Sequence, residues 1–277
     1  MVLCSGCGVE DGGFQGPSPA PGGEDAATSG VTRPWSDAAL RPDATLPDGP
    51  SLPDAAPDAR PPADGPPPAD GPPPPPGEAC PDDPNLVLCL PFEGDASDHS
   101  RQHRKVTAAA LGYSPGPSGL AADLHAGSVV AVAPAPELDA PAVTVEAWVQ
   151  PRTLAERAGF VDSNGHFALL ALPSGNVYCV GQGTVFAAGA ARPGQWTSLA
   201  CTFSASQVSI YVDGRLVTSS PAAFTGTGGA GISVGADDPS GHPLDGLLDN
   251  VRVWNGVRTP AQICAAARNC RSDQRAP

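Results

Sequence analysis

Eight cysteines are the residues whose type and number point most directly to a chemistry. An even set in a Pro-rich chain with little Lys is typical of disulfides formed in an oxidising compartment. Zinc is disfavoured because the C-terminal half has no C-x-x-C pair and no His at ligand spacing, which leaves buried free thiols as the other alternative. Six of the cysteines belong to that half: Cys80, Cys89, Cys179, Cys201, Cys264 and Cys270.

Two polar segments, Asp162–Phe167 and Asp237–His242, carry side chains that could bind a ligand. A sugar site needs an aromatic ring for the apolar sugar face and carboxylate, amide or backbone groups for the hydroxyls. Such residues concentrate on loops, although Asn, Asp and Gly also simply form turns. The candidate ligand-binding residues are Asp162, Asn164, His166, Tyr178, Asp237 and His242.

The net charge of −14 excludes some classes of partner. An acidic chain cannot neutralise nucleic-acid phosphates, nor does it offer a basic patch to an anionic membrane. No segment is apolar enough over a sufficient length to span a bilayer. We therefore expect no nucleic acid partner, and membrane contact only through an anchor.

The N-terminal segment Met1–Cys7 suggests such an anchor. Its Ser-Gly-Cys ending resembles the tail of a bacterial lipoprotein signal peptide, with Cys7 as the lipidated residue. Cys4 stands where Leu is usual, and the charged and apolar parts of a signal peptide are missing, as they would be if the start site lay upstream. The alternative is a chance pair of cysteines.

Residues 8–79 differ from the rest of the chain in composition and in hydrophobic pattern. They lack hydrophobic periodicity, are rich in Pro, Gly, Asp and Ala, and repeat Ala-Asp-Gly-Pro-Pro-Pro at 63–68 and 69–74. Such a composition buries too little apolar surface to fold, and its Pro runs favour extended polyproline II. We predict a disordered stalk; a Pro-rich docking ligand is the alternative, disfavoured because no basic PxxP site is present.

From residue 80 onward, short apolar runs alternate with turn residues. Val143–Val149 alternates strictly, as a half-buried strand does, and Leu247–Trp254 is a further strand pattern. Val208–Val212 and Arg215–Thr218 are joined by Asp-Gly, a strong hairpin signal because Gly accepts the positive φ of a tight turn. Helical signal is confined to Pro260–Arg268, preceded by Thr259 as N-cap. Many short strands predict an all-β sandwich or jelly roll.

Taken in order, these segments resemble the laminin-G-like, concanavalin A-like jelly roll found in bacterial surface proteins. The resemblance implies a β-sandwich used for recognition, although the fold hosts lectins, adhesins, glycosidases and structural modules. It covers the C-terminal half and none of the stalk. The matching segments are Leu86–Gly94, Asp98–Ser100, Gly116–Ala121, Val143–Pro151, Gly194–Ala200, Ser209–Gly214, Gly246–Trp254 and Thr259–Ile263.

The resemblance also implies a structural calcium ion, held between the first acidic loop and the last strand. Glu93, Asp98 and Asp249 fall at the corresponding places. Calcium prefers six to eight oxygens, some of which Gly-rich turns can supply as backbone carbonyls. The alternative is that Asp249 only caps a turn.

Catalysis, by contrast, is not expected. Glucanases of this fold use E-x-D-x-x-E, and the nearest match, Glu137-Leu138-Asp139, has Ala142 at the third position. G-x-S-x-G, H-E-x-x-H and a phosphate loop are also missing. We predict no catalytic residue and a protein that is not an enzyme, with a degenerate glycoside hydrolase as the remote alternative.

The strands of this fold suggest a disulfide pairing. Cys179 with Cys201 would cross between strands, Cys80 with Cys89 would fix the first strand, and Cys264 with Cys270 would close the end of the helix. Six cysteines allow about fifteen connectivities, and the main rival joins Cys80 to Cys270.

The sequence thus predicts a secreted recognition or adhesion module for a glycan or a cell-surface protein, with an outer-membrane lipoprotein as one form. A structural or protein-binding module without a small ligand is the alternative. The predicted boundaries are 1–7 for a signal remnant, 8–79 for the linker, 80–272 for the jelly roll and 273–277 for a tail.

Overall fold

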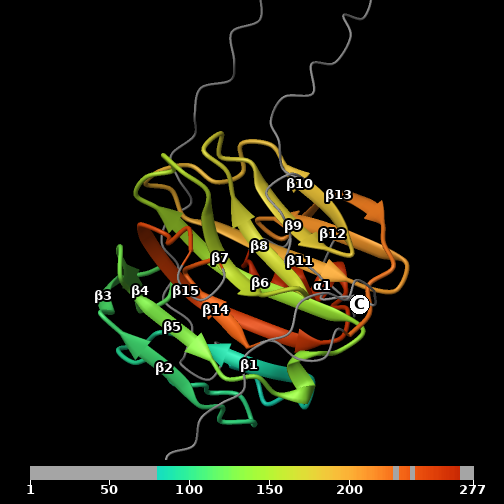
Figure 1. Cartoon of the computed structure of the whole chain (residues 1–277), viewed down its shortest axis with the longest axis horizontal. Helices are drawn as coiled ribbons and strands as arrows, with labels where there is room; N and C mark the ends of the chain where they lie inside the picture. The colour runs from blue at the N-terminus through green and yellow to red at the C-terminus, as the bar shows by residue number, and fades with distance from the viewer. Residues whose placement is uncertain (1–79, 227–230, 238–240, 269–277) are drawn as a thin grey trace, which may run out of the picture. The chain divides into compact units, whose positions relative to one another are not determined.

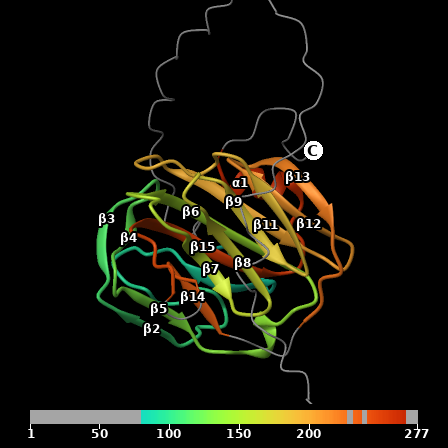
Figure 2. The ribbon, with the colours of Figure 1, turned by 45° about the horizontal axis from the view of Figure 1, so that its top comes forward.

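The computed structural model describes residues 80–226, 231–237 and 241–268. In these residues the chain forms two antiparallel β-sheets packed face to face (Figures 1 and 2). The predicted all-β jelly-roll sandwich is confirmed. The predictions for residues 1–79 and 269–277, including the stalk, Cys7 and Cys270, lie outside the described residues.

Sheet I has eight strands and sheet II has seven. Sheet I runs in the order β13 (Arg215–Pro221), β12 (Gln207–Val212), β11 (Thr197–Phe203), β6 (Val143–Pro151), β15 (Gly246–Asn255), β4 (Leu120–Leu124) and β3 (Gly112–Pro115), with β1 (Leu86–Leu90) also paired to β15. Sheet II runs β10 (Gly183–Ala187), β9 (Val177–Gly181), β8 (Phe167–Ala171), β7 (Ala158–Ser163), β14 (Ile232–Val234), β5 (Val129–Val132) and β2 (Val106–Ala109).

The core between the sheets follows from period-two alternation. On β6, Val143, Val145, Ala147 and Val149 all belong to the main hydrophobic cluster, as the alternating sequence predicts. Aromatic rings stack across the two sheets in this core: the ring centroids of Phe167 on β8 and Phe203 on β11 lie 5.9 Å apart. The inward side chains fix the register, so each remaining side chain of a strand faces outward.

The predicted hairpin and helix are both confirmed. Asp213 and Gly214 have φ angles of 47° and 75°, the left-handed values that a two-residue turn between β12 and β13 requires. Helix α1 (Pro260–Ala266) begins with Thr259 as N-cap, in a capping box with Gln262. No helix in the described residues is long and apolar enough to cross a membrane.

Two of the predicted disulfides are present among the described residues, Cys80–Cys89 and Cys179–Cys201. The second joins β9 of sheet II to β11 of sheet I through the core, so it links the two layers rather than neighbouring strands. Cys264 is disulfide-bonded as well, and its predicted partner lies outside the described residues. The rival pairing of Cys80 with Cys270 is excluded.

Candidate functional site

The outer face of sheet II brings together part of the predicted ligand site. Because Cys179 points into the core, its neighbours Tyr178 and Val180 on β9 point outward. The ladder places Leu170 of β8, Tyr178 of β9 and Phe186 of β10 in one row across this face. The row therefore ends in two adjacent aromatic rings at the edge of the sheet.

Tyr178 and Phe186 form a stacked pair. Their ring centroids are 5.3 Å apart with an interplanar angle of 23°. Phe186 is 48% exposed, which is a large exposed fraction for an aromatic side chain. Tyr178 packs on the buried Leu170 below it, so the pair is held in place and offers its surface to solvent. Two nearly parallel rings on a rigid sheet provide the platform that the apolar face of a sugar requires.

Polar groups flank this platform on the side of β7. Asp162 lies on the outer face of β7, opposite Ala168 of β8 and Ser233 of β14. It is 5% exposed and has its own interactions, so only part of its carboxylate is accessible. A neighbouring strand is about 4.8 Å away, which places Asp162 two strands, or roughly 10 Å, from the strand of Tyr178.

The loop between β14 and β15 approaches the same face. A side chain on Gly159 of β7 would clash with the backbone of Ala236 and Asp237, so glycine is required for this approach. The N–H of Gly159 donates to the carbonyl of His242, at 3.0 Å. Asp237 forms an ion pair with Arg157, the residue that precedes β7 in the sequence. The structure thus places Asp162, Asp237 and His242 at β7, and Tyr178 two strands away on the same outer face of sheet II.

His166 does not belong to this surface, which corrects the prediction from its Asn-Gly neighbourhood. Its ring is 1% exposed and stacks on Phe224 with centroids 4.5 Å apart. Nδ1 lies 3.7 Å from Oδ1 of Asp139. Burial lowers the pKa of His166, and the charge of Asp139 acts in the opposite direction. Asn164 lies half-buried in the turn between β7 and β8, two residues before His166.

Asp249 on β15 is the second notable group, because it is a completely buried carboxylate. Its exposed fraction is 0%, and neither carboxylate oxygen has a hydrogen-bond partner among the described residues. Burial raises its pKa to about 7, and the negative charge of Glu93 acts in the same direction. The N–H groups of Asn250 and Ser118, which approach the carboxylate without good hydrogen-bond geometry, oppose this only in part. The charges of Asp249 and Arg252, three residues further along β15, interact, yet burial remains the largest effect on this carboxylate.

Glu93 faces Asp249 from the loop after β1. One of its oxygens accepts the N–H of Leu120 at 3.0 Å, and a side chain on Gly119 would overlap its carboxylate. Gly119 also has a φ of 77°, so this close turn is built for glycine. Glu93 and Asp249, two of the three predicted calcium ligands, thus lie close enough for their charges to interact.

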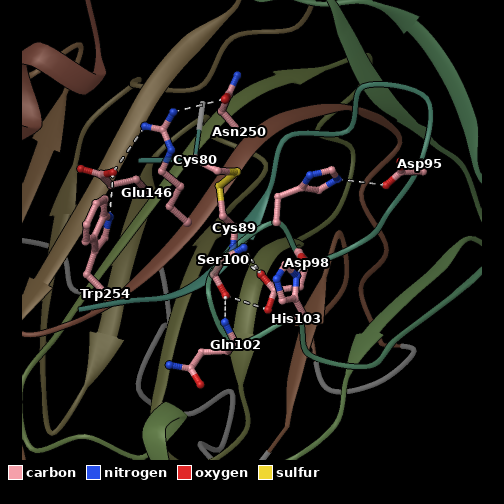
Figure 3. The surroundings of a disulfide bond; sticks show 12 residues. Cys80, Cys89, Asp95, Asp98, Ser100, Gln102, His103, Glu146, Asn250 and Trp254 are labelled. Carbon is pink, nitrogen blue, oxygen red and sulfur yellow. Dashed lines mark hydrogen bonds and ion pairs between the residues drawn. A yellow bond between two sulfur atoms is a disulfide. The ribbon is translucent and has the colours of Figure 1, made fainter. Parts of the chain in front are cut away.

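Asp98, the third predicted ligand, has a different environment. Its carboxylate accepts four hydrogen bonds of 2.8–2.9 Å, from the N–H groups of Cys89, Ser100 and Arg104 and from the hydroxyl of Ser100. Figure 3 shows it turned toward Ser100 and His103, beside the Cys80–Cys89 disulfide. Within the described ranges, no three His, Cys, Asp or Glu side chains are grouped so as to hold a metal.

Two functional features escaped sequence reasoning. Phe186 was missed because the strand after Gly181-Gln182-Gly183 was not recognised; its Thr-Val-Phe-Ala alternation is the signal that could have found it. The other is the buried Glu146, which accepts the indole N–H of Trp254 at 3.0 Å and pairs with Arg258 (Figure 3 shows Glu146 and Trp254). Arg258 also lies 4.1 Å above the Trp254 ring. This network fastens the segment before α1 to sheet I.

The chain is an all-β sandwich, and four of its candidate binding residues lie on one outer face. A model of the concanavalin A-like lectin/glucanases superfamily matches residues 125–264, and the chain belongs to that family. No curated protein matches the sequence.

Solved structures share the fold at low sequence identity. Domain 4 of AbnA, a GH43 extracellular arabinanase from Geobacillus stearothermophilus solved with arabinotriose, is 23% identical with a TM-score of 0.52 over 66% of this chain and 98% of that domain. The receptor binding domain of botulinum neurotoxin C/D mosaic serotype is 12% identical, with a TM-score of 0.56 over 66% of this chain and 51% of the other. The binding domain of Paraclostridial Mosquitocidal Protein 1 is 13% identical, with a TM-score of 0.56 and coverages of 66% and 52%. The chain thus spans about half the length of these two binding domains.

Proposed function

We propose that this protein is an extracellular, non-catalytic recognition module that binds a saccharide on the outer face of sheet II. The observation that carries the proposal is the stacked Tyr178–Phe186 pair, exposed at the edge of a rigid sheet. An exposed aromatic pair beside fixed polar groups suits a ligand with one apolar face and a rim of hydroxyls. A solved neighbour of the same fold was obtained with arabinotriose, which supports a saccharide as the class of ligand.

The polar groups around the platform have separate roles in this proposal. The Arg157–Asp237 ion pair fixes the loop that borders the site, and His242 holds that loop to β7 through its carbonyl. The accessible parts of Asp162 and His242 would then bind sugar hydroxyls.

Location at the cell surface is part of the same proposal. The disulfides Cys80–Cys89 and Cys179–Cys201 fit an oxidising, extracellular environment. Lipidation at Cys7 would anchor the module to a membrane, and the Pro-rich segment would hold it away from that membrane. A cell-surface protein is the alternative ligand, and the receptor binding domains among the structural neighbours favour it.

We further propose a structural calcium ion between Asp249 and Glu93. Asp249 fits a cation because its two buried oxygens have no partner among the described residues, and the second carboxylate faces it. Backbone carbonyls of the neighbouring glycine-containing turn would have to complete the shell of oxygens. Asp98 is excluded as a ligand because hydrogen bonds already occupy both of its oxygens.

A glycan-array screen of the full, oxidised chain tests the main proposal. We expect binding to one class of sugar, reduced at least about tenfold in Tyr178→Ala and in Phe186→Ala, since about 1.4 kcal/mol of stacking corresponds to that factor. Leu120→Ala is the matched control, because Leu120 is 37% exposed on β4, near the end of sheet I that is opposite to β13. Binding that is unchanged by both aromatic substitutions would place the site elsewhere, and binding to no sugar would favour the protein ligand.

A further inference from the structure

A cavity of about 510 Å³ opens at the opposite edge of sheet II from the aromatic platform. Its walls are the loop after β1 and the edge strand β2. Ligand pockets in proteins are typically about 300–1,000 Å³, so the size suits a small organic molecule. The lining residues are Ala96, Ser97, Asp98, His103, Arg104, Val106 and Ala108.

The wall formed by the loop is rigid. Asp98 holds the loop together through its four hydrogen bonds. One of the donors is the N–H of Cys89, which also forms the disulfide with Cys80 (Figure 3). His103 has a φ of 44°, a left-handed value that a side chain other than glycine adopts only under constraint. Its Nδ1 lies 3.3 Å from the carbonyl oxygen of Asp98. The side chains of the loop are therefore fixed before any ligand arrives.

Arg104 is the charged group in the cavity wall. Its side chain is 9% exposed, its Nε donates to the carbonyl of Val87 at 2.8 Å, and its Nη2 donates to Glu137 at 3.1 Å. No described residue accepts a hydrogen bond from Nη1. The guanidinium is thus held in one orientation by two partners while the remaining donors stay available for a ligand.

The charge of this region contrasts with the rest of the chain. Arg101, Arg104 and Lys105 place three cations within five residues, in a chain of net charge −14 whose only lysine is Lys105. Arg101 is paired with Asp82, while Glu137 and Asp98 keep some negative charge close to Arg104. The three cations and the three anions named here cancel, so no net positive charge would compensate a doubly charged phosphate.

We propose that this cavity binds the carboxylate of an acidic sugar, a uronate, with Arg104 as the anion-binding residue. Arginine binds a carboxylate through paired N–H donors, and the hydroxyl of Ser97 and the imidazole of His103 suit the neighbouring sugar hydroxyls. Val106 and Ala108 provide an apolar wall for the ring. The site uses different elements from the Tyr178–Phe186 platform, so it goes beyond the proposed function and does not depend on it.

The test is calorimetric titration of the full, oxidised chain with glucuronate, with glucose and with inorganic sulfate. We expect glucuronate to bind, glucose not to bind, and sulfate to bind at least about tenfold more weakly than glucuronate. Arg104→Lys keeps the positive charge but loses the paired N–H donors of the guanidinium, and should weaken glucuronate binding about tenfold. His103→Ala should weaken it less and serves if Arg104→Lys fails to fold, because the His103 side chain bonds to the loop through the carbonyl of Asp98 and the substitution keeps the backbone bond to Ser100.

Tyr178→Ala separates this site from the platform, because glucuronate binding should be unchanged in that variant. Equal affinity for glucose and glucuronate, or no binding of glucuronate by the native chain, would overturn the proposal. Equal affinity for sulfate and glucuronate would also overturn it, since the cavity would then recognise charge alone. A loss of glucuronate binding in Tyr178→Ala would reassign it to the platform.

Discussion

Two aspartates of this molecule are equally buried and have opposite environments. Asp98 is 4% exposed and accepts four hydrogen bonds, whereas Asp249 is 0% exposed and accepts none of good geometry from the described residues. Burial alone would destabilise either charge, so the hydrogen bonds decide the outcome. Asp98 therefore organises its loop through these hydrogen bonds, while burial favours the neutral form of Asp249 up to about pH 7. Burial of a carboxylate does not by itself distinguish a structural from a ligand-binding role.

The largest effect is expected for Asp98→Ala. Removing the carboxylate leaves its N–H and hydroxyl donors without an acceptor, and each unsatisfied buried group costs about 1–3 kcal/mol. We expect a loss of about 3–5 kcal/mol in the free energy of unfolding, measured by urea denaturation of the oxidised chain. The control is Asp95→Ala, an exposed position in the same loop, with a change below about 1 kcal/mol. Similar losses of unfolding free energy in Asp98→Ala and Asp95→Ala would show that the hydrogen bonds of Asp98 do not stabilise the loop.

Asp249→Asn, by contrast, should raise the free energy of unfolding. The native pKa of about 7 lies above the ordinary value of 3.8, so the stability associated with the protonated form is present below pH 3.8 and lost as the pH rises through about 7. In EDTA at pH 8 the neutral amide should therefore stabilise the fold, by about 2–4 kcal/mol. Thermal unfolding at pH 5 and pH 8 checks this, because the gain should shrink at the lower pH. A destabilised variant at pH 8 would mean that attraction to Arg252 outweighs the cost of burying the Asp249 charge.

Calcium should remove the advantage of Asp249→Asn by stabilising the native chain. Millimolar calcium is expected to raise the melting temperature of the native chain, corresponding to about 2.7 kcal/mol at a hundredfold excess over the dissociation constant. Asp249→Asn should abolish the shift and Glu93→Gln should reduce it, while Asp98→Asn should leave the shift intact even though the fold is weakened. A melting temperature that is insensitive to both calcium and EDTA would contradict the proposed cation.

His166 extends the comparison to a buried group whose neutral form is favoured by the fold. Its native pKa is lowered, so its contribution to stability is complete above about pH 6.5, the ordinary value, and is lost as the pH falls toward the native pKa. His166→Phe should make the melting temperature less dependent on pH between about 5 and 7, and this is the smallest effect predicted. His125→Phe is a suitable control because the His125 side chain is 59% exposed. An identical pH dependence in native protein and His166→Phe would show that His166 is not responsible.

The fold was predictable from sequence because its signals are local. The Asp213-Gly214 turn and the alternation of Val143–Val149 each specify a structure within a few residues, and both were confirmed. The candidate site was predictable only in part. Asn164-Gly165 indicates a turn, but the direction of His166 depends on Phe224, which lies far along the chain. The hydrogen bonds of Asp98 likewise join residues whose proximity only the folded chain creates.

The Cys80–Cys89 disulfide has a mechanical consequence. Cys89 lies in β1, where it is paired with Arg252 of β15, and Asp98 accepts its N–H. A pull on the chain before Cys80 passes through the sulfur atoms directly to Cys89, so residues 81–88 carry no tension. The load then acts within the ladder and must shear the bonds around Cys89 together, instead of peeling β1 from Leu86 one bond at a time. Reduction would restore the peeling geometry, so the oxidised domain should withstand larger forces when it is stretched from its N-terminal side.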